Sequence, residues 1–327
     1  MQRRTLFAAP LLAAPAFAPV ALAQSWRPGQ PVRVIVPVAP GGTTDIIGRI
    51  VAQHLQTLWG TPVVVENRPG AGGTIGSAEM ARARPDGLTL LSGNVGSQAI
   101  AYSLFRNLPY TIVQQVPIIG TIRGPNVLVC NNDVPARNLP EFIAWVRGQR
   151  GRAAFGSTGV GQSTHLTPVW MLQLLGAEAT HVPFRGSAPM QTDLLAGNVQ
   201  FAIDNLTGVI ELVRSGRVRA LAVTSAARSP QLPEVPALRE GGGELAGFDV
   251  NTWFGIFGPP GLPEATLRSI NADVRALLEL PATQQRFAEL GGMAFPNTPE
   301  EFAGFVRTEA ARWGQVIRRE GLQLDAG

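Results

Sequence analysis

Short apolar runs alternate with stretches of helical periodicity along the first third of the chain. Residues 32–38 (VRVIVPV) are almost wholly apolar, as expected of a buried parallel strand, and residues 46–60 carry apolar side chains at helical spacing. Strands are also predicted at 62–67 and 86–94, with a helix at 77–85 between them. This alternation of strand, loop and helix predicts a doubly wound α/β unit.

A second series of strands and helices begins near Pro125. After it, residues 248–261 predict a strand that returns to the first unit, and residues 263–321 predict three amphipathic helices. Thr298 and Glu301 have the spacing of a capping box at the start of the last helix. The strands predicted in the second series are 126–132, 153–159, 179–184, 198–205 and 219–225, and the helices are 139–149, 163–176 and 188–197.

The segment FGSTGVGQSTH, residues 155–165, has the form of a phosphate-binding loop without its lysine. Gln162 takes the position at which such a loop carries lysine. The segment keeps closely spaced glycines, hydroxyl side chains and the start of a helix, a combination that suits a single carboxylate. An ordinary strand-to-helix turn is the alternative, but the run of small residues exceeds what such a turn needs.

The loop APGGTTD, residues 39–45, follows the same logic. Gly41 and Gly42 expose backbone N–H groups, the two threonines supply hydroxyls, and Asp45 is expected to cap the helix that follows. A third loop, RPGAGGTIG at 68–76, resembles a dinucleotide-binding fingerprint but has one residue too many before its last glycine. We therefore expect no dinucleotide site and no cofactor.

The charge pattern excludes several function classes. The chain has 27 arginines and no lysine. A Schiff-base mechanism, which needs a lysine amine, is therefore excluded. The formal charge of +4 becomes +2, from 25 arginines and 23 acidic residues, without Arg3 and Arg4 of the segment expected to be removed. No arginine-rich run with interleaved aromatic residues occurs, so nucleic acid is not expected as a partner.

The N-terminus has the pattern of an export signal. A charged start, MQRR, precedes an apolar stretch, and a small-x-small cleavage site ends at Ala23. A membrane anchor is the alternative, but three prolines and abundant alanine argue against it. The arginine pair leaves open the general secretory and the twin-arginine routes. We expect residues 1–23 to be a cleaved signal peptide and the mature protein to be periplasmic.

Residues that offer hydrolytic or metal chemistry are few. The chain has no G-x-S-x-G elbow and only three histidines, among them His165 and His181. A Ser157–His165–Asp204 triad can be drawn, but no motif supports it. No cluster has metal-ligand spacing, so no metal site is expected. Cys130, the only cysteine, lies in a strand-like apolar run and is expected to be buried and inert.

Several long segments together resemble the Bug (TctC-like) family, the extracytoplasmic solute-binding proteins of tripartite tricarboxylate transporters. The resemblance runs through almost the whole mature chain. The segments that carry it are IVPVAPGGTTD, VVENRPGAGGTIGSAEMARARPDGLTLL, FGSTGVGQSTHL, HVPFRGSAPMQTDLLAGNVQFAIDN, RALAVTSAARSPQLPEVPALRE, TWFGIFGPPGLP and TPEEFAGFVRTEAARWG.

This resemblance implies two doubly wound α/β domains of the periplasmic-binding-protein type, joined by crossing strands, with a ligand cleft between them. Domain 1 is expected to comprise residues 24–123 and 250–327, and domain 2 residues 124–249. It also implies that two loops form a pincer around one ligand carboxylate. Position 38 is often aromatic in relatives, and the valine here leaves more room for the ligand or offers less stacking. The residues expected to bind the ligand are Val38, Gly41, Gly42, Thr43, Asp45, Ser92, Ser157, Thr158, Gly159, Gly161, Ser163, Gly186 and Asp204.

The function expected from the resemblance is capture of a small carboxylate-bearing ligand, such as a dicarboxylate, an amino acid or an aromatic acid. The ligand would pass to the membrane subunits of a tripartite tricarboxylate transporter, and the protein is expected to be a monomer and not an enzyme. The Asp204 carboxylate would disfavour a second ligand carboxylate nearby. A receptor that reports to a sensor kinase would share the site and differ only in its partner. An exported hydrolase, with Ser157 as nucleophile, is a second alternative.

Overall fold

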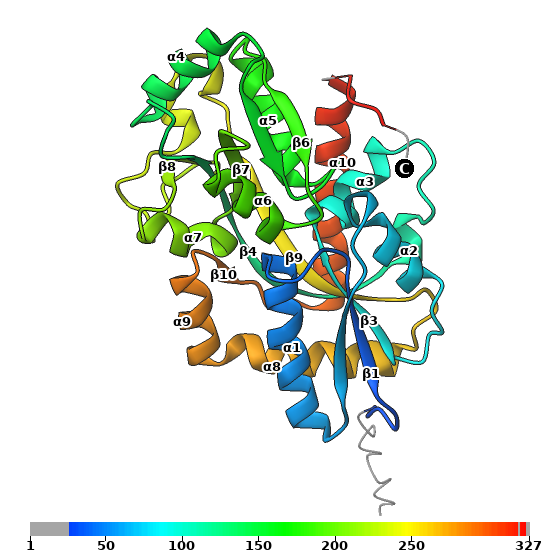
Figure 1. Cartoon of the computed structure of the whole chain (residues 1–327). Helices are drawn as coiled ribbons and strands as arrows, with labels where there is room; N and C mark the ends of the chain where they lie inside the picture. Colours follow the sequence, from blue (N-terminus) through cyan, green and yellow to red (C-terminus); the bar gives the residue numbers. More distant parts are fainter. Residues whose placement is uncertain (1–25, 320, 325–327) are drawn as a thin grey trace, which may run out of the picture.

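The computed structural model describes residues 26–319 and 321–324, so the predicted signal peptide lies outside the described residues. Helices flank a twisted sheet with the strand order β2-β1-β3-β9-β4-β7-β5-β6, and β8 and β10 also pair with β4 (Figure 1). The strands are β1 (Val32–Val36), β2 (Val63–Asn67), β3 (Thr89–Asn94), β4 (Val116–Cys130), β5 (Ala154–Ser157), β6 (Thr180–Pro183), β7 (Phe201–Asn205), β8 (Arg219–Val223), β9 (Asn251–Gly258) and β10 (Met293–Ala294). The helices are α1 (Thr43–Trp59), α2 (Thr74–Ala81), α3 (Ala101–Leu104), α4 (Leu139–Gln149), α5 (Ser163–Leu174), α6 (Ser187–Leu195), α7 (Leu206–Arg214), α8 (Glu264–Glu279), α9 (Pro281–Glu289) and α10 (Pro299–Arg319).

The sheet has two halves, which we define by their strands. The first half contains β1, β2, β3, β9 and β10, and β1 runs parallel to both β2 and β3. The second half contains β5, β6, β7 and β8, and β5 runs parallel to both β6 and β7. In each half a helix follows each of the parallel strands, because a parallel connection needs a crossover. The predicted α/β class is confirmed.

Strand β4 belongs to both halves. Its residues 116–125 pair antiparallel with β9, and its residues 126–130 pair antiparallel with β7. β4 therefore passes through the predicted domain boundary after residue 123 without a break. The division into domains at residues 24–123 plus 250–327 and 124–249 stays a prediction.

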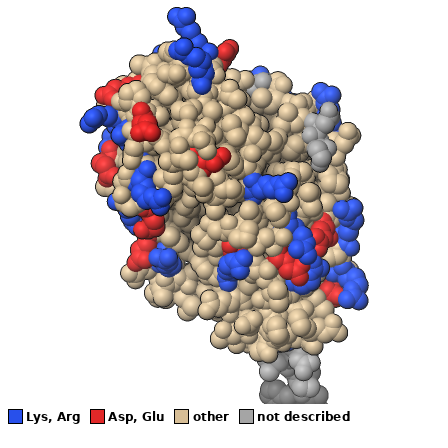
Figure 2. All heavy atoms as spheres, viewed as in Figure 1, with Lys and Arg blue, Asp and Glu red and all other residues tan. Residues whose placement is uncertain are grey.

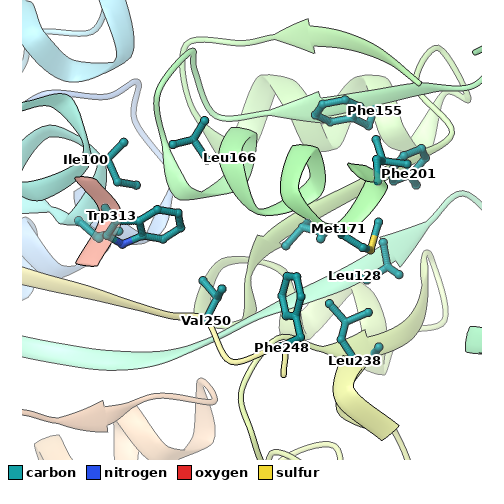
Figure 3. Packing of buried hydrophobic residues seen from close by; sticks show 14 of the residues in the cluster. Ile100, Leu128, Phe155, Leu166, Met171, Phe201, Leu238, Phe248, Val250 and Trp313 are labelled. Atoms are coloured by element: carbon teal, nitrogen blue, oxygen red, sulfur yellow. The ribbon is translucent and has the colours of Figure 1, made fainter. Parts of the chain in front are cut away.

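A large buried cluster joins the two halves. It includes Ile100 and Trp313 from the first half and Phe155, Leu166 and Phe201 from the second, all less than 3% exposed (Figure 3). Burial of apolar side chains is the main favourable contribution to folding, at about 25 cal/mol for each Å² removed from water. The halves are thus stabilised against one another on the side where this cluster lies.

Helix α1 shows how the sequence fixes an element of the site. Ile47, Val51 and Leu55 recur every four residues and are fully buried, so one face of the helix packs on the sheet. Gly60 ends the helix with a φ of 65°, a left-handed conformation that favours glycine. At the other end, Gly42 is the N-cap, so α1 begins directly after the loop that follows β1.

All the elements predicted from the pattern are present, and some were missed. The capping box is confirmed: the Thr298 N–H donates to Glu301 at 2.8 Å, and the Glu301 N–H donates to the Thr298 hydroxyl at 3.2 Å. Cys130 is buried as expected, and burial raises the pKa of its thiol to about 11. The missed elements are α7, α3, β10, the short 3-10 turns, the π-helical turn at Gly96–Ile100 and the first ten residues of β4.

Candidate functional site

Four helices begin at one small cavity between the halves, which we call the inner cavity. The N-cap residues of α1, α5, α6 and α7 are Gly42, Gln162, Gly186 and Asn205, and all four line it. In Figure 1 the start of α1 lies beside α6, and a Cβ built on Gly42 would meet Ser187 at 3.5 Å. The cavity has a volume of about 10 Å³. The residues that line it are Val38, Gly42, Thr43, Thr44, Asn94, Thr158, Gln162, Ser163, Gly186, Ser187, Asn205, Thr252 and Phe254.

The lining of the inner cavity is polar without being charged. It carries hydroxyl and amide side chains, and none of its residues is an arginine, aspartate or glutamate. Each helix N-terminus adds backbone N–H groups that have no acceptor within the helix and a partial positive charge of about half a unit. Thr43 is 1% exposed, and its hydroxyl has no hydrogen-bond partner among the described residues; the same holds for Oδ1 of Asn205. The arrangement is chemically suited to a small anion.

The loop from Val38 to Asp45, which we call the first loop, is held by the Asp45 carboxylate. This carboxylate accepts hydrogen bonds of 2.9 Å from the Gly41 N–H, from Arg49 Nε and from Asn67 Nδ2. Burial alone would raise the pKa of Asp45, but these three hydrogen bonds outweigh it and lower the pKa. Asp45 therefore holds the loop from within the first turn of α1. The expectation that it caps the helix is wrong, because Gly42 is the N-cap and no side chain bonds to it as a cap.

The loop from Ser157 to Ser163, which we call the second loop, is held by neutral groups. The Ser157 hydroxyl lies 2.7 Å from His181 Nε2, and the Thr158 N–H donates to the Thr164 hydroxyl at 2.9 Å. The Gly161 N–H donates to His165 Nδ1 at 3.2 Å, and the two imidazole rings stack with their centroids 3.9 Å apart. Burial lowers the pKa of His165 to about 3, with a further contribution from the neighbouring ring, and that of His181 to about 4.

The Ser157–His165–Asp204 arrangement that the sequence allows is absent. Ser157 bonds to His181, because β5 and β6 are parallel neighbours. Asp204 accepts hydrogen bonds from Ser187 at 3.0 Å and Gln191 at 2.8 Å, and it does not contact either histidine. Burial raises the pKa of Asp204, and its hydrogen bonds offset only part of that rise.

The loops of the two halves touch in this structure. Gln162 Nε2 donates to the Gly72 carbonyl at 2.5 Å, and the Ala39 N–H donates to the Arg185 carbonyl at 2.8 Å. A Cβ built on Gly72 would lie 2.0 Å from the Val160 carbonyl oxygen, so only glycine fits there. Glycine thus permits a close approach of main chain to main chain across the cleft.

Thirteen residues were predicted to bind a ligand, and the structure divides them into two groups. Val38, Gly42, Thr43, Thr158, Ser163 and Gly186 line the inner cavity. The others do not: the Gly41 N–H is taken by Asp45, and the Ser92 hydroxyl donates to the Thr44 carbonyl at 3.1 Å. The residues outside the lining are Gly41, Asp45, Ser92, Ser157, Gly159, Gly161 and Asp204.

Seven lining residues were not among those predicted. Gln162, Ser187 and Asn205 each stand where a strand or its loop passes into a helix, so the rule that found the two loops also applies to them. Thr252 and Phe254 come from β9, and no local pattern marks them. The remaining two are Thr44 and Asn94.

Metal chemistry and membrane insertion find no support within the described ranges. Across residues 26–319 and 321–324, no group of three or more histidine, cysteine or acidic residues is arranged to hold a metal ion. The same part of the chain contains no helix with the length and apolar character needed to cross a bilayer.

Comparisons with known proteins agree with this architecture. A family model described as "Tripartite tricarboxylate transporter family receptor" matches residues 47–322. The chain is 33% identical to the periplasmic binding protein BugD, with a TM-score of 0.86, over 90% of this chain and 99% of that one. It is 32% identical to R. palustris Rpa4515, solved with adipate, with a TM-score of 0.87, over 90% of this chain and 99% of that one. It is also 32% identical to MatC (Rpa3494) from Rhodopseudomonas palustris, solved with bound malate, with a TM-score of 0.84, over 89% and 99% of the two chains. The chain therefore belongs to the Bug (TctC-like) family of periplasmic solute-binding proteins.

Proposed function

We propose that the inner cavity binds the carboxylate of a small organic acid. One observation carries the proposal: four helices begin at a space with no charged side chain in its lining, and one of the lining residues, Thr43, has a buried hydroxyl without a partner among the described residues. Backbone N–H groups and helix dipoles at such a place stabilise negative charge. Two similar structures were solved with carboxylates, adipate and malate, which supports the same class of ligand.

The ligand acts by holding the two halves together. A space of about 10 Å³ is close to the size of one water, so a carboxylate enters only when the halves move apart, and they then close around it less tightly than in this structure. A carboxylate bound by both loops has more contacts in the closed form than in the open form. It therefore shifts the equilibrium towards the closed form by its difference in affinity for the two.

The closed protein then delivers its ligand to the membrane subunits of a tripartite tricarboxylate transporter. The family description supports this partner class, because it names a receptor of such a transporter. We propose that the protein works as a monomer in the periplasm after removal of residues 1–23. A strain that lacks the membrane subunits should keep ligand binding and lose uptake. If uptake persists in that strain, and deletion of this protein abolishes the response of a sensor kinase, the receptor alternative holds.

Titration calorimetry with Thr43→Val tests the carboxylate site. Valine keeps the shape of threonine and removes the hydroxyl, so affinity for a bound carboxylate should fall by about 10- to 100-fold. Thr57→Val is the matched control, because Thr57 lies in the same helix and its hydroxyl bonds only to the Gln53 carbonyl. Small-angle scattering should report closure in the wild type. Equal affinity of the wild type and Thr43→Val would contradict the site.

A further inference from the structure

A separate cavity, which we call the hinge cavity, lies where β4 and β9 pass from one half to the other. Its volume is about 430 Å³, within the range of sites for small organic ligands. The first half contributes residues of β10 and α10, and the second half contributes residues between 225 and 231, after β8. Met293 is 59% exposed and Trp253 is 1% exposed, and both line the cavity, so it extends from the surface down to the buried strand β9.

Strand β9 forms the wall between the hinge cavity and the inner cavity. Thr252 and Phe254 line the inner cavity, whereas Trp253 lines the hinge cavity. This agrees with the alternation of side chains between the two faces of a strand. Thr252 belongs to both linings, so the two cavities are separated by the thickness of a single strand.

The two halves also meet at another wall of the hinge cavity. Gly291, in the loop between α9 and β10, lines the cavity, and a Cβ built on it would lie 2.6 Å from the Leu206 side chain of the second half. Leu206 begins α7, whose N-cap Asn205 lines the inner cavity. A movement of one half relative to the other therefore displaces this wall, and the shape of the hinge cavity depends on how far the halves have closed.

The wall of the hinge cavity is largely apolar and partly aromatic. The rings of Trp253 and Phe305 both line it, with their centroids 5.4 Å apart and their planes at 73° to each other. Met293, Pro125 and Pro230 add further apolar surface. Aromatic side chains offer a large apolar area and pack well against another ring in edge-to-face or offset geometry. The lining therefore suits a flat apolar molecule.

The charged side chains in the lining already have partners. Glu309 pairs with Arg312 at 3.4 Å, and Arg228 pairs with Glu240 at 2.6 Å. The guanidinium of Arg123 lies over a phenylalanine ring, 4.9 Å from its centroid. Arginines and acidic residues are likewise interspersed on the face of the molecule shown in Figure 2. An occupant of the hinge cavity therefore needs no charge of its own.

We propose that the hinge cavity is a regulatory site for a small uncharged aromatic molecule, which favours closure of the cleft from the other side of β9. The cavity has this shape in the arrangement in which the loops of the two halves touch, so an occupant binds that arrangement better than an open one. Its difference in affinity for the two shifts the equilibrium towards the closed form. Because such coupling is reciprocal, the occupant and the ligand of the inner cavity would raise the affinity for one another by the same factor.

Titration of the mature protein with 2-naphthol, followed by NMR, tests the site. The wild type should bind it with a dissociation constant on the order of 1 mM. Ala227→Leu places a larger side chain in the lining and should weaken binding at least tenfold. Ala226→Leu is the matched control, because Ala226 is the neighbouring exposed residue and lies outside the lining; its affinity should stay within about twofold of the wild type. No binding to the wild type, or equal binding to the two variants, would overturn the site.

Small-angle scattering tests the coupling to closure. In the absence of any carboxylate, saturating 2-naphthol should lower the radius of gyration of the wild type and of Ala226→Leu, and it should leave that of Ala227→Leu unchanged. If 2-naphthol binds in the wild type without lowering the radius of gyration, the regulatory role is overturned. Neither measurement uses a carboxylate, so the inference and the proposed function can fail independently.

Discussion

The first and second loops occupy equivalent places in the two halves but are fastened by different chemistry. Each follows a strand, carries paired or closely spaced glycines, and ends at the start of a helix. The first loop is tied to a buried carboxylate, Asp45, whose charge is balanced by Arg49. The second loop is tied to Ser157, His165 and His181, and all its hydrogen bonds are between neutral groups.

This difference separates the conditions under which each loop is stable. The pKa of Asp45 is lowered on folding, so its contribution is present above its unfolded value and is lost only in acid below that value. The two histidines have lowered values as well, but they are bases, so the folded state keeps them neutral while the unfolded state takes up protons. The second loop therefore loses stability at a pH at which the first loop keeps it.

Gly72→Ala has the largest expected effect, because it breaks the contact between Gly72 of the first half and Val160 of the second loop. The added Cβ would lie 2.0 Å from the Val160 carbonyl oxygen, so the closed form is blocked and ligand affinity should fall by more than about 100-fold. Gly60→Ala is the matched control, since Gly60 has a nearly equal φ and open space around its Cβ. Calorimetry measures both variants, and equal affinities would show that closure does not need this contact.

Asp45→Ala tests the hydrogen bonds and the ion pair by which the Asp45 carboxylate holds the first loop. The Gly41 N–H and the partly buried Asn67 amide would lose their acceptor, which should lower the free energy of unfolding by about 1–2 kcal/mol. Asp45→Asn keeps one acceptor oxygen and should cost less. Denaturant titrations at pH 7 measure both. A loss below about 0.5 kcal/mol for the alanine variant would mean that the loop is held by other contacts.

A fall in pH tests the hydrogen bonds that the neutral His165 and His181 make in the second loop. Between pH 6.5 and 5 the unfolded chain gains protons on His165 and His181 while the folded protein does not, because their folded pKa values are about 3 and 4. The free energy of unfolding should therefore fall by about 1–2 kcal/mol for each histidine over this range. In denaturant titrations, His165→Gln should reduce the slope with pH, and an unchanged slope would contradict the assignment.

Ser157→Ala has the smallest expected effect. It removes the hydrogen bond to His181 and leaves a nitrogen of a half-buried ring without its partner, at a cost of about 1 kcal/mol in unfolding free energy. Ligand affinity should change by less than about threefold, because Ser157 does not line the inner cavity. The same variant tests the hydrolase alternative. If the wild type hydrolyses an ester and Ser157→Ala does not, the hydrolase interpretation is supported.

Periodicity identified the elements well, and it failed where the signal was not local. The apolar spacing of α1 predicted the helix correctly, because one buried face repeats every turn. The first part of β4 was missed, since Pro117, Gly120 and Gly124 interrupt its pattern while pairing with β9 holds it extended. Tertiary pairing can overrule local preference in this way.

The candidate site was also predicted only in part, because some of its contacts are set by tertiary pairing and not by local sequence. The glycine-rich loops led to residues that line the inner cavity, and glycine also permits the close approach of main chain at Gly72. No pattern in the sequence predicted that Ser157 bonds to His181, because the neighbour of a strand in the sheet is set by topology and His181 lies on the next strand. Thr252 and Phe254 were not found, since they reach the cavity only through the crossing of β9.

The single cysteine gives the protein an internal reporter. Cys130 ends β4 in the second half, is fully buried, and keeps its thiol protonated at neutral pH. A thiol reagent therefore reacts only with molecules in which that end of the strand has become accessible. Its reaction rate measures how often the strand end opens in the native protein. Cysteines introduced at the rims of the cleft would react first, which allows dyes to be placed there without removing the native residue.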